Sequence, residues 1–144
     1  RGIFNNPLTS ELTSLVPDEG SLTPMPLGQC HGDLTFSNIL ITRDSRIFVI
    51  DLLDSFIESP LIDIVKLRQD TYHYWSIKRS CSGFDRTKIE IIFDKFDKVI
   101  CETFCHIKWW SNYQFFQRFN LCRILPYVKD PSIVEFLKNE LERV

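Results

Sequence analysis

Two short apolar runs, residues 38–42 and 47–51, lie on either side of a polar tetrapeptide. Runs rich in β-branched residues and joined by such a loop are typical of a β-hairpin. If the inner ends of the runs pair, Asn38 lies directly opposite Asp51 on one face. The pattern therefore predicts a hairpin that brings an amide and a carboxylate together, provided that no bulge or one-residue slip intervenes.

Apolar residues recur at helical spacing through the rest of the chain. We expect a first helix from Pro60, with Ser59 as its N-cap, up to a break at 79–83. A long helix follows over about 85–106, and Thr87 and Glu90 fit a capping box near its start. The residues expected on the buried faces of these two helices are Leu61, Ile64, Val65 and Tyr72, then Ile89, Ile92, Phe93, Phe96, Ile100 and Phe104.

Two more helices are expected near the carboxy terminus. One covers about 112–125 and stops before Pro126, and the other begins at Asp130-Pro131, with Phe136, Leu137 and Leu141 on one face. One hairpin followed by helices is an α+β pattern. Residues 1–28 carry four prolines among Ser, Thr and Asn, which is typical of a linker, although Leu12 and Leu15 fit a short packed turn.

Composition narrows the class of protein. The chain has 144 residues, 44% of them hydrophobic, which is enough for a core. The net charge of −2 gives no general attraction to nucleic acid or to an anionic membrane, and we expect neither as a partner. No apolar run is long enough to span a bilayer. Five cysteines without a regular framework favour reduced thiols and a cytoplasmic location.

The segment from His31 to Asn38 and the later Asp51 carry the candidate chemistry. A carboxylate such as Asp33 can accept a hydroxyl proton, and the oxygens of Asn38 and Asp51 are ligands that Mg²⁺ prefers. Each residue also has a simpler interpretation: Asp33 as a solvated loop carboxylate, and Asn38 and Asp51 as strand-end residues. The spacing of all three favours catalysis, and His31 then fits a hydrogen-bonded structural role better than that of a base.

These residues resemble the catalytic segment of the aminoglycoside phosphotransferase and choline kinase-like family, which has a protein-kinase-like fold. The shared pattern is His-Gly-Asp, four residues, Asn, then a hydrophobic strand that ends in Asp. Leu52-Leu53 stands where protein kinases have Phe-Gly, which favours the small-molecule kinase branch. The resemblance covers residues 29–68 well and the helical remainder loosely.

The resemblance implies a role for each matching residue. Asp33 is the catalytic aspartate, Asn38 and Asp51 are the Mg²⁺ ligands, and His31 supports the loop. Asp63, in the segment Ser-Pro-Leu-Ile-Asp, braces the catalytic loop and should be a buried carboxylate with a backbone partner. By this resemblance, residues 29–144 form a mostly helical carboxy-terminal lobe whose small hairpin carries the catalytic loop.

The amino-terminal lobe of that family has no counterpart in the sequence. None of the five glycines forms a phosphate-binding Gly-rich loop, and the first residue is Arg1 rather than Met. We therefore expect a piece of a longer protein, with residues 1–28 as the linker from a missing lobe. Alone, it should be nearly inactive and should expose apolar surface at Leu12, Leu15 or a paired tryptophan, which favours self-association.

Two functions fit these features. The first is the catalytic lobe of a kinase that transfers the γ-phosphoryl group of ATP, with Mg²⁺, to a sugar, an amino alcohol or an aminoglycoside. The alternative is a non-catalytic kinase-like scaffold or partner-binding module within a larger protein.

Other chemistry-bearing residues have simpler explanations. Asp54 and Glu58 fit solvated loop positions or weak contacts to metal or acceptor. Cys101, Cys105 and His106 have spacing that suits a metal, but zinc would need a fourth ligand such as Cys122, so reduced core thiols are favoured. The adjacent Trp109 and Trp110 cannot both face one core from a helix, so one should be exposed or at an interface.

Overall fold

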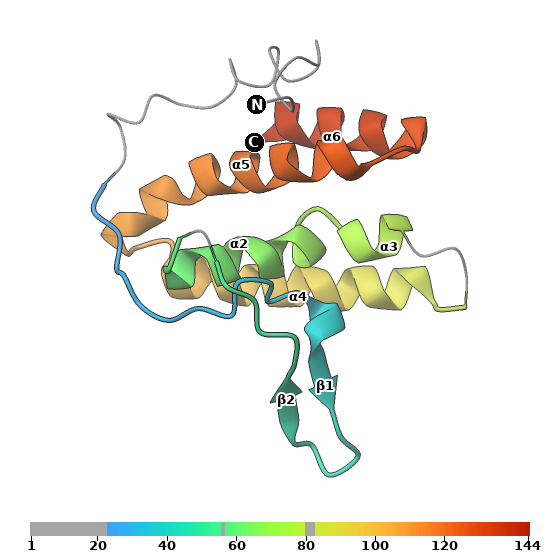
Figure 1. Ribbon diagram of the computed structural model, residues 1–144. Coiled ribbons are helices and arrows are strands. Elements are labelled where there is room, and N and C mark those ends of the chain that lie inside the picture. The colour runs from blue at the N-terminus through green and yellow to red at the C-terminus, as the bar shows by residue number, and fades with distance from the viewer. Residues whose placement is uncertain (1–22, 56, 80–82) are drawn as a thin grey trace. The chain divides into compact units, whose positions relative to one another are not determined.

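The computed structural model describes residues 23–55, 57–79 and 83–144 (Figure 1). The chain divides into two compact units: residues 24–110, and residues 111–144 with 1–23. The described chain is α+β and mostly helical, with one two-stranded antiparallel sheet. No helix in the described ranges is long and apolar enough to cross a membrane.

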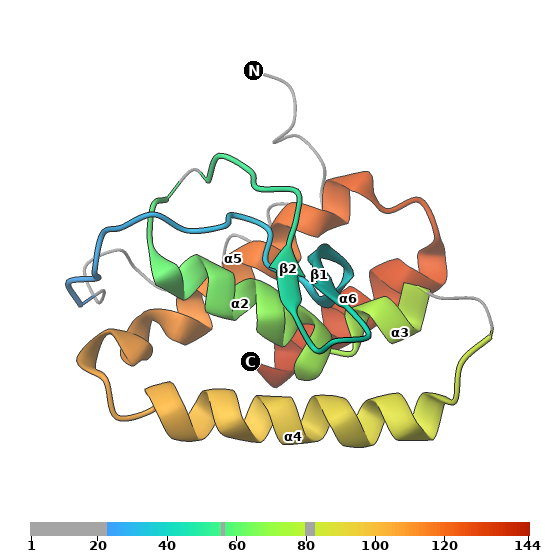
Figure 2. The ribbon, with the colours of Figure 1, turned by 90° about the horizontal axis from the view of Figure 1, so that it is seen from below.

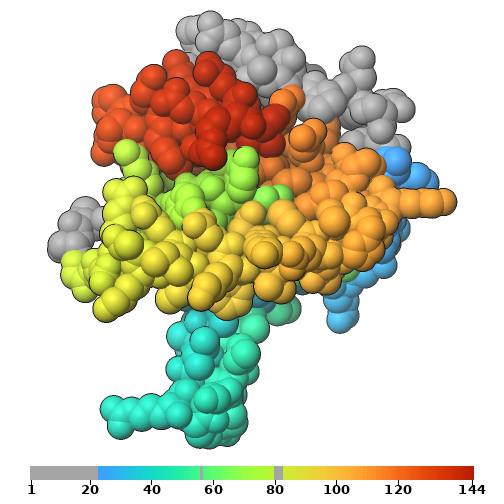
Figure 3. All heavy atoms as spheres, turned by 180° about the vertical axis from the view of Figure 1, so that it is seen from behind, coloured from blue at the N-terminus to red at the C-terminus, as the bar shows by residue number. Residues whose placement is uncertain are grey.

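The first unit contains the hairpin and three α-helices. Its elements are η2 (Phe36–Asn38), β1 (Ile39–Ile41), β2 (Ile47–Val49), α2 (Pro60–Thr71), α3 (Trp75–Arg79) and α4 (Arg86–Phe104). The short 3₁₀ helix η3 (Lys108–Asn112) follows α4 and crosses into the second unit. The hairpin extends away from α2 and α4 as a narrow arm, as the space-filling view shows (Figure 3).

The predicted hairpin is present, but its register differs by one residue from the predicted one. Ile41 pairs with Ile47, and the N–H of Ile50 donates to the carbonyl of Asn38 at 3.0 Å. Asn38 therefore lies opposite Ile50 and not opposite Asp51.

The turn explains the slip in register. The N–H of Thr42 donates to the carbonyl of Arg46 at 2.9 Å, so the loop has three residues rather than four. Ser45, the last loop residue, has φ +62°, as the left-handed position of a three-residue hairpin loop requires. Reading Arg46 as part of the loop shifted every predicted pair by one residue.

Helix α2 begins where the sequence predicted. The Ser59 hydroxyl accepts a hydrogen bond from the N–H of Leu61, and Pro60 occupies the first turn. Leu61, Ile64 and Val65 are buried. The helix ends at Thr71 and not near residue 78, because the chain turns at Tyr74, whose φ is +54°. One expected helix is therefore two, α2 and α3.

Helix α4 runs back along α2 in the opposite direction (Figure 2). Its N-cap is Asp85, whose side chain accepts from the N–H of Lys88, so the expected capping box of Thr87 and Glu90 does not start the helix. Phe93 and Ile100 are buried, but Ile92 and Phe96 are 48% and 47% exposed. The predicted apolar face of α4 is therefore only partly covered.

An arginine at the end of α2 ties that helix to α4. Arg68 makes two hydrogen bonds to the Asp97 carboxylate, at 2.7 and 3.0 Å. Its guanidinium also lies over the rings of Tyr72 and Trp110, 4.8 and 5.7 Å from their centroids. This bidentate, aromatic-covered pair fixes the position of α2 against α4.

The paired tryptophans do not separate into one buried and one exposed residue. Both are half-buried, and both contact Phe104, with ring centroids 5.9 Å from Trp109 and 6.3 Å from Trp110. They lie in the 3₁₀ helix η3, where successive side chains are spaced differently from those of an α-helix. Leu12 and Leu15, the other residues expected on an apolar surface, lie outside the described residues.

The second unit is a pair of helices, α5 (Tyr113–Ile124) and α6 (Pro131–Arg143). A 3₁₀ turn, η4 (Leu125–Tyr127), follows α5 around Pro126, close to the predicted stop. Asp130 caps α6 by accepting from the N–H of Ser132 at 2.8 Å. Leu121, Leu137 and Leu141 are almost fully buried and form the core of this unit.

Candidate functional site

The His-Gly-Asp segment adopts a turn that requires its glycine. Gly32 has φ +79°, and a Cβ at this position would lie 2.3 Å from the carbonyl oxygen of Leu53. The N–H of Leu53 in turn donates to the carbonyl of His31 at 2.9 Å. The segment after the hairpin therefore packs directly against this loop, and any side chain at position 32 would separate the two.

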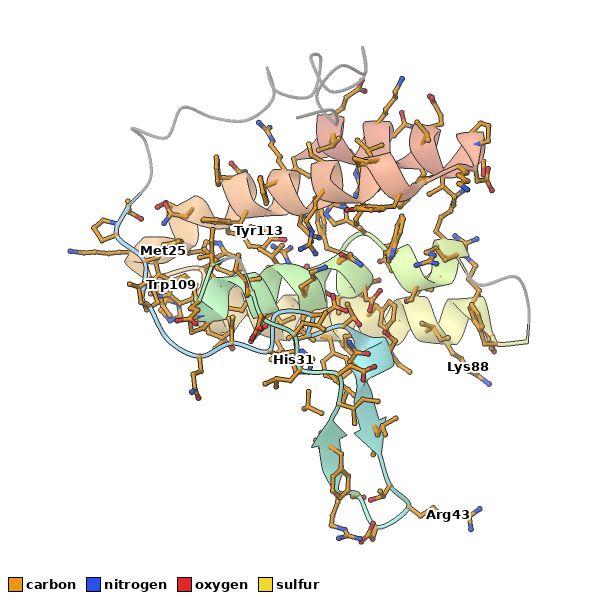
Figure 4. All side chains as sticks on the ribbon, in the orientation of Figure 1. Met25, His31, Arg43, Lys88, Trp109 and Tyr113 are labelled. Carbon is orange, nitrogen blue, oxygen red and sulfur yellow. The ribbon has the colours of Figure 1, made fainter. Side chains whose placement is uncertain are left out.

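His31 is buried at the base of the hairpin, where both of its ring nitrogens have backbone partners (Figure 4). Nδ1 accepts from the N–H of Asp33 at 3.3 Å, so the ring proton lies on Nε2, which is 2.7 Å from the carbonyl oxygen of Ile50. His31 therefore links the loop to the end of β2. These contacts support the structural interpretation of His31 and leave the ring no free nitrogen for use as a base.

Asp63, in the first turn of α2, holds the same loop from the other side. Its carboxylate accepts hydrogen bonds from the N–H groups of His31 at 2.7 Å and Gly32 at 2.9 Å. The side chain is half-buried, and it has the backbone partners that the sequence predicted for it. Two consecutive amides on one carboxylate fix the backbone around His31, two residues before Asp33.

Asp70 makes a second anchor two turns further along α2. Its carboxylate accepts from the N–H of Phe36 at 3.0 Å and from the N–H of Ser76 at 3.1 Å. Asp70 is 2% exposed, and this burial raises the pKa of its carboxyl group above the ordinary value. The Phe36 ring packs on Phe93 and Phe96 of α4, so the far end of the loop is fixed to both helices.

Asp33 lies between these two anchors and is partly open to solvent. Its Oδ1 is 3.0 Å from the Nζ of Lys66, and its Oδ2 is 3.3 Å from the Nδ2 of Asn38. The Asp33 side chain is 31% exposed, whereas that of Lys66 is only 7% exposed. The carboxylate is thus held in place but remains accessible to a small molecule.

Asn38 is brought to Asp33, but the hairpin does not pair it with Asp51. The Asn38 amide nitrogen also donates to the backbone carbonyl of Asp33 at 2.8 Å, so both of its contacts with Asp33 are made through the nitrogen. Asp51 is exposed and has φ +58°, which ends the regular alternation of β2. The argument that the strand register brings Asn38 and Asp51 together is therefore wrong.

The donor chemistry of these two residues still suits a hard cation. Among the described residues, the Asp51 carboxylate and the Asn38 amide oxygen accept no side-chain hydrogen bond or ion pair that would occupy them. Two oxygen donors are few for Mg²⁺, which commonly completes its shell with substrate phosphates and water. No group of three or more His, Cys, Asp or Glu side chains in the described ranges is placed to hold a metal ion.

The remaining candidates lie outside this cluster. Asp54 and Glu58 are exposed. Cys105 is exposed, with its sulfur 3.8 Å from the Nδ1 of the adjacent His106, while Cys101 is half-buried and burial raises the pKa of its thiol. Neither arrangement supports a zinc site.

The sequence reasoning missed Lys66 and Asp70. With Asp63 they occupy positions i, i+3 and i+7 of α2, which lie on one face of a helix whose other positions are largely buried. Charged residues that recur at this spacing, on one side of the helix, are the signal that would have identified them.

Comparison with protein-family models, with curated proteins and with solved structures finds no match to this chain. The resemblance to small-molecule kinases therefore depends on the motif residues and on the contacts described above.

Proposed function

We propose that this chain is the catalytic lobe of a protein-kinase-like enzyme that phosphorylates a small hydroxyl-bearing molecule. The observation that carries the proposal is the placement of Asp33: a partly exposed carboxylate, on a loop anchored by Asp63 and Asp70, with a polar group beside each oxygen. A general base must be both positioned and accessible, and Asp33 is both.

In the proposed reaction, the acceptor hydroxyl donates a hydrogen bond to Asp33. Its oxygen forms a bond to the γ-phosphorus of ATP, the bond from that phosphorus to the β–γ bridging oxygen breaks, and ADP leaves. The hydroxyl proton goes to the Asp33 carboxylate. The acceptor is a sugar, an amino alcohol or an aminoglycoside, since each offers a hydroxyl of this kind.

Mg²⁺, when bound, would offset the charge of the ATP phosphates. Asn38 and Asp51 are the residues we propose for it, because the family resemblance assigns them to the metal and because amide and carboxylate oxygens are hard donors. His31 and Asp63 support the site without touching substrate. A cytoplasmic location is part of the proposal and is supported by the free thiols of Cys30, Cys101, Cys105 and Cys122.

The test is ADP release by the full-length protein, with ATP, Mg²⁺ and a panel of sugars, amino alcohols and aminoglycosides. Asp33→Asn keeps the shape of the side chain and removes the base, so kcat should fall by about 10²–10⁴-fold. Glu102→Gln is the matched control, because Glu102 is an exposed carboxylate on α4. Turnover that survives Asp33→Asn at saturating substrates would remove Asp33 from the mechanism.

The alternative, a non-catalytic kinase-like module, predicts a different result. The full-length protein would then release no ADP with any acceptor, and Asp33→Asn would leave binding to its macromolecular partner unchanged.

A further inference from the structure

Lys66, in the middle of α2, is a buried lysine whose ammonium group forms an ion pair with Asp33, the candidate base. Its Nζ lies 3.0 Å from the Oδ1 of Asp33, and only 7% of its side chain is exposed. Lysine is rarely buried to this degree without a functional or ionic partner. We infer that Lys66 is a positioning residue that fixes the orientation of the Asp33 carboxylate for phosphoryl transfer. This inference rests on the proposed function.

Three side chains on one face of α2 contact this loop. Asp63 holds the backbone just before Asp33, Asp70 holds the N–H of Phe36 just after it, and Lys66 lies between them on α2. Lys66 therefore contacts the Asp33 side chain, while the two aspartates hold the loop backbone on either side of Asp33. The ammonium contacts Oδ1 and the Asn38 amide contacts Oδ2, so together they favour a single orientation of the Asp33 carboxylate.

Stability alone does not account for the ion pair. Desolvation of two charges often cancels their attraction, so an apolar pair of similar volume would hold the loop as well. The pair does have a chemical consequence. A free carboxylate close to a Mg²⁺ site is itself a strong ligand for the ion. An ammonium on Oδ1 repels a dication, which reserves Asp33 for the acceptor hydroxyl and leaves the metal to Asn38 and Asp51.

The first test is kinetic and uses the full-length protein. Lys66→Met should lower kcat by about 10²-fold, the usual cost of a misplaced catalytic group, with the KM for ATP nearly unchanged. Lys66→Arg, which keeps the charge, should recover much of that loss. Lys95→Met is the matched control, since Lys95 is exposed on α4 and should retain the wild-type kcat. A Lys66→Met protein with the wild-type kcat would overturn the inference.

A double-mutant cycle separates this inference from the proposed function. In an Asp33→Asn background, Lys66→Met should cause no further loss of kcat, because Lys66 acts only through Asp33. A further loss as large as in the wild-type background would indicate a general structural role and would overturn the inference. If Asp33→Asn alone leaves turnover intact, the proposed function fails. If only Lys66→Met leaves it intact, the function stands and the inference fails.

A second readout needs no activity. Mn²⁺ is titrated into this chain and the free ion is followed by electron paramagnetic resonance. Lys66→Met should bind Mn²⁺ at least about tenfold more tightly, because it removes a positive charge that repels the ion. Even at the dielectric constant of water, the repulsion between a unit charge and a dication a few ångströms apart corresponds to about tenfold in affinity. Unchanged or weaker binding would overturn the inference. If circular dichroism shows that Lys66→Met does not fold, Lys66→Gln replaces it, because its amide keeps a donor at the buried position.

Discussion

The Asp63 carboxylate accepts a hydrogen bond from the backbone N–H of His31 at 2.7 Å, across 32 positions of the chain. The same carboxylate accepts from the N–H of Gly32 at 2.9 Å. A residue of α2 thus sets the orientation of the two peptide groups on either side of His31. The conformation of the loop is therefore held by a helix that comes later in the sequence.

Removing this carboxylate should destabilise the protein. In Asp63→Ala, two amides lose a charged acceptor, and hydrogen bonds to charged groups contribute about 1.5–3 kcal/mol each to the free energy of unfolding. Urea unfolding of this chain measures the loss, with Glu102→Ala as the control on an exposed carboxylate. An Asp63→Ala protein as stable as the wild type would end the bracing role of Asp63.

Asp70 should make stability depend on pH in a defined direction. Burial raises the pKa of its carboxyl group above 3.8, so the folded protein binds a proton that the unfolded chain releases. The contribution of Asp70 to stability is therefore complete below pH 3.8 and falls as the pH rises through the raised pKa. Asp70→Asn cannot titrate, so the difference in unfolding free energy between wild type and Asp70→Asn should shrink from acid pH towards pH 7. A difference that grows over this range would contradict the raised pKa.

This chain alone should bind nucleotide weakly and transfer little phosphate. Its sequence offers Mg²⁺ two protein ligands at most near Asp33, and no Gly-rich loop grips the phosphates. Calorimetric titration with ATP and Mg²⁺, together with a phosphoryl-transfer assay, measures both quantities. Tight nucleotide binding with turnover would contradict the prediction, because it would show that phosphoryl transfer does not need an amino-terminal lobe.

The hairpin should promote association of the isolated chain. Ile41, Ile47, Phe48 and Val49 are all at least 46% exposed, and an apolar surface of this kind favours self-contact. Phe48→Lys should lower the associated fraction in sedimentation velocity, because it places a charge in the patch. Glu102→Gln, which raises the net charge by the same one unit on α4, should leave that fraction unchanged. Equal sedimentation of wild type and Phe48→Lys would exclude the hairpin as the contact.

The sequence alone determined the features that depend on neighbouring residues. Two helices begin where the sequence predicts, at Ser59-Pro60 and at Asp130-Pro131. In each, a side-chain oxygen caps the helix and a proline occupies its first turn. The hairpin follows from two β-branched runs and a polar loop. These are local conformational preferences, so a single sequence contains them.

Tertiary structure decided what depends on residues far apart in the chain. The hairpin register depends on which residue closes the turn, and Arg46 pairs with Thr42 because Ser45 takes the left-handed conformation. The contacts of Lys66 with Asp33 and of Asp70 with Phe36 join positions 33 and 34 residues apart. Such pairs form only when a helix packs against a loop, because the desolvation that makes them strong exists only in the folded chain.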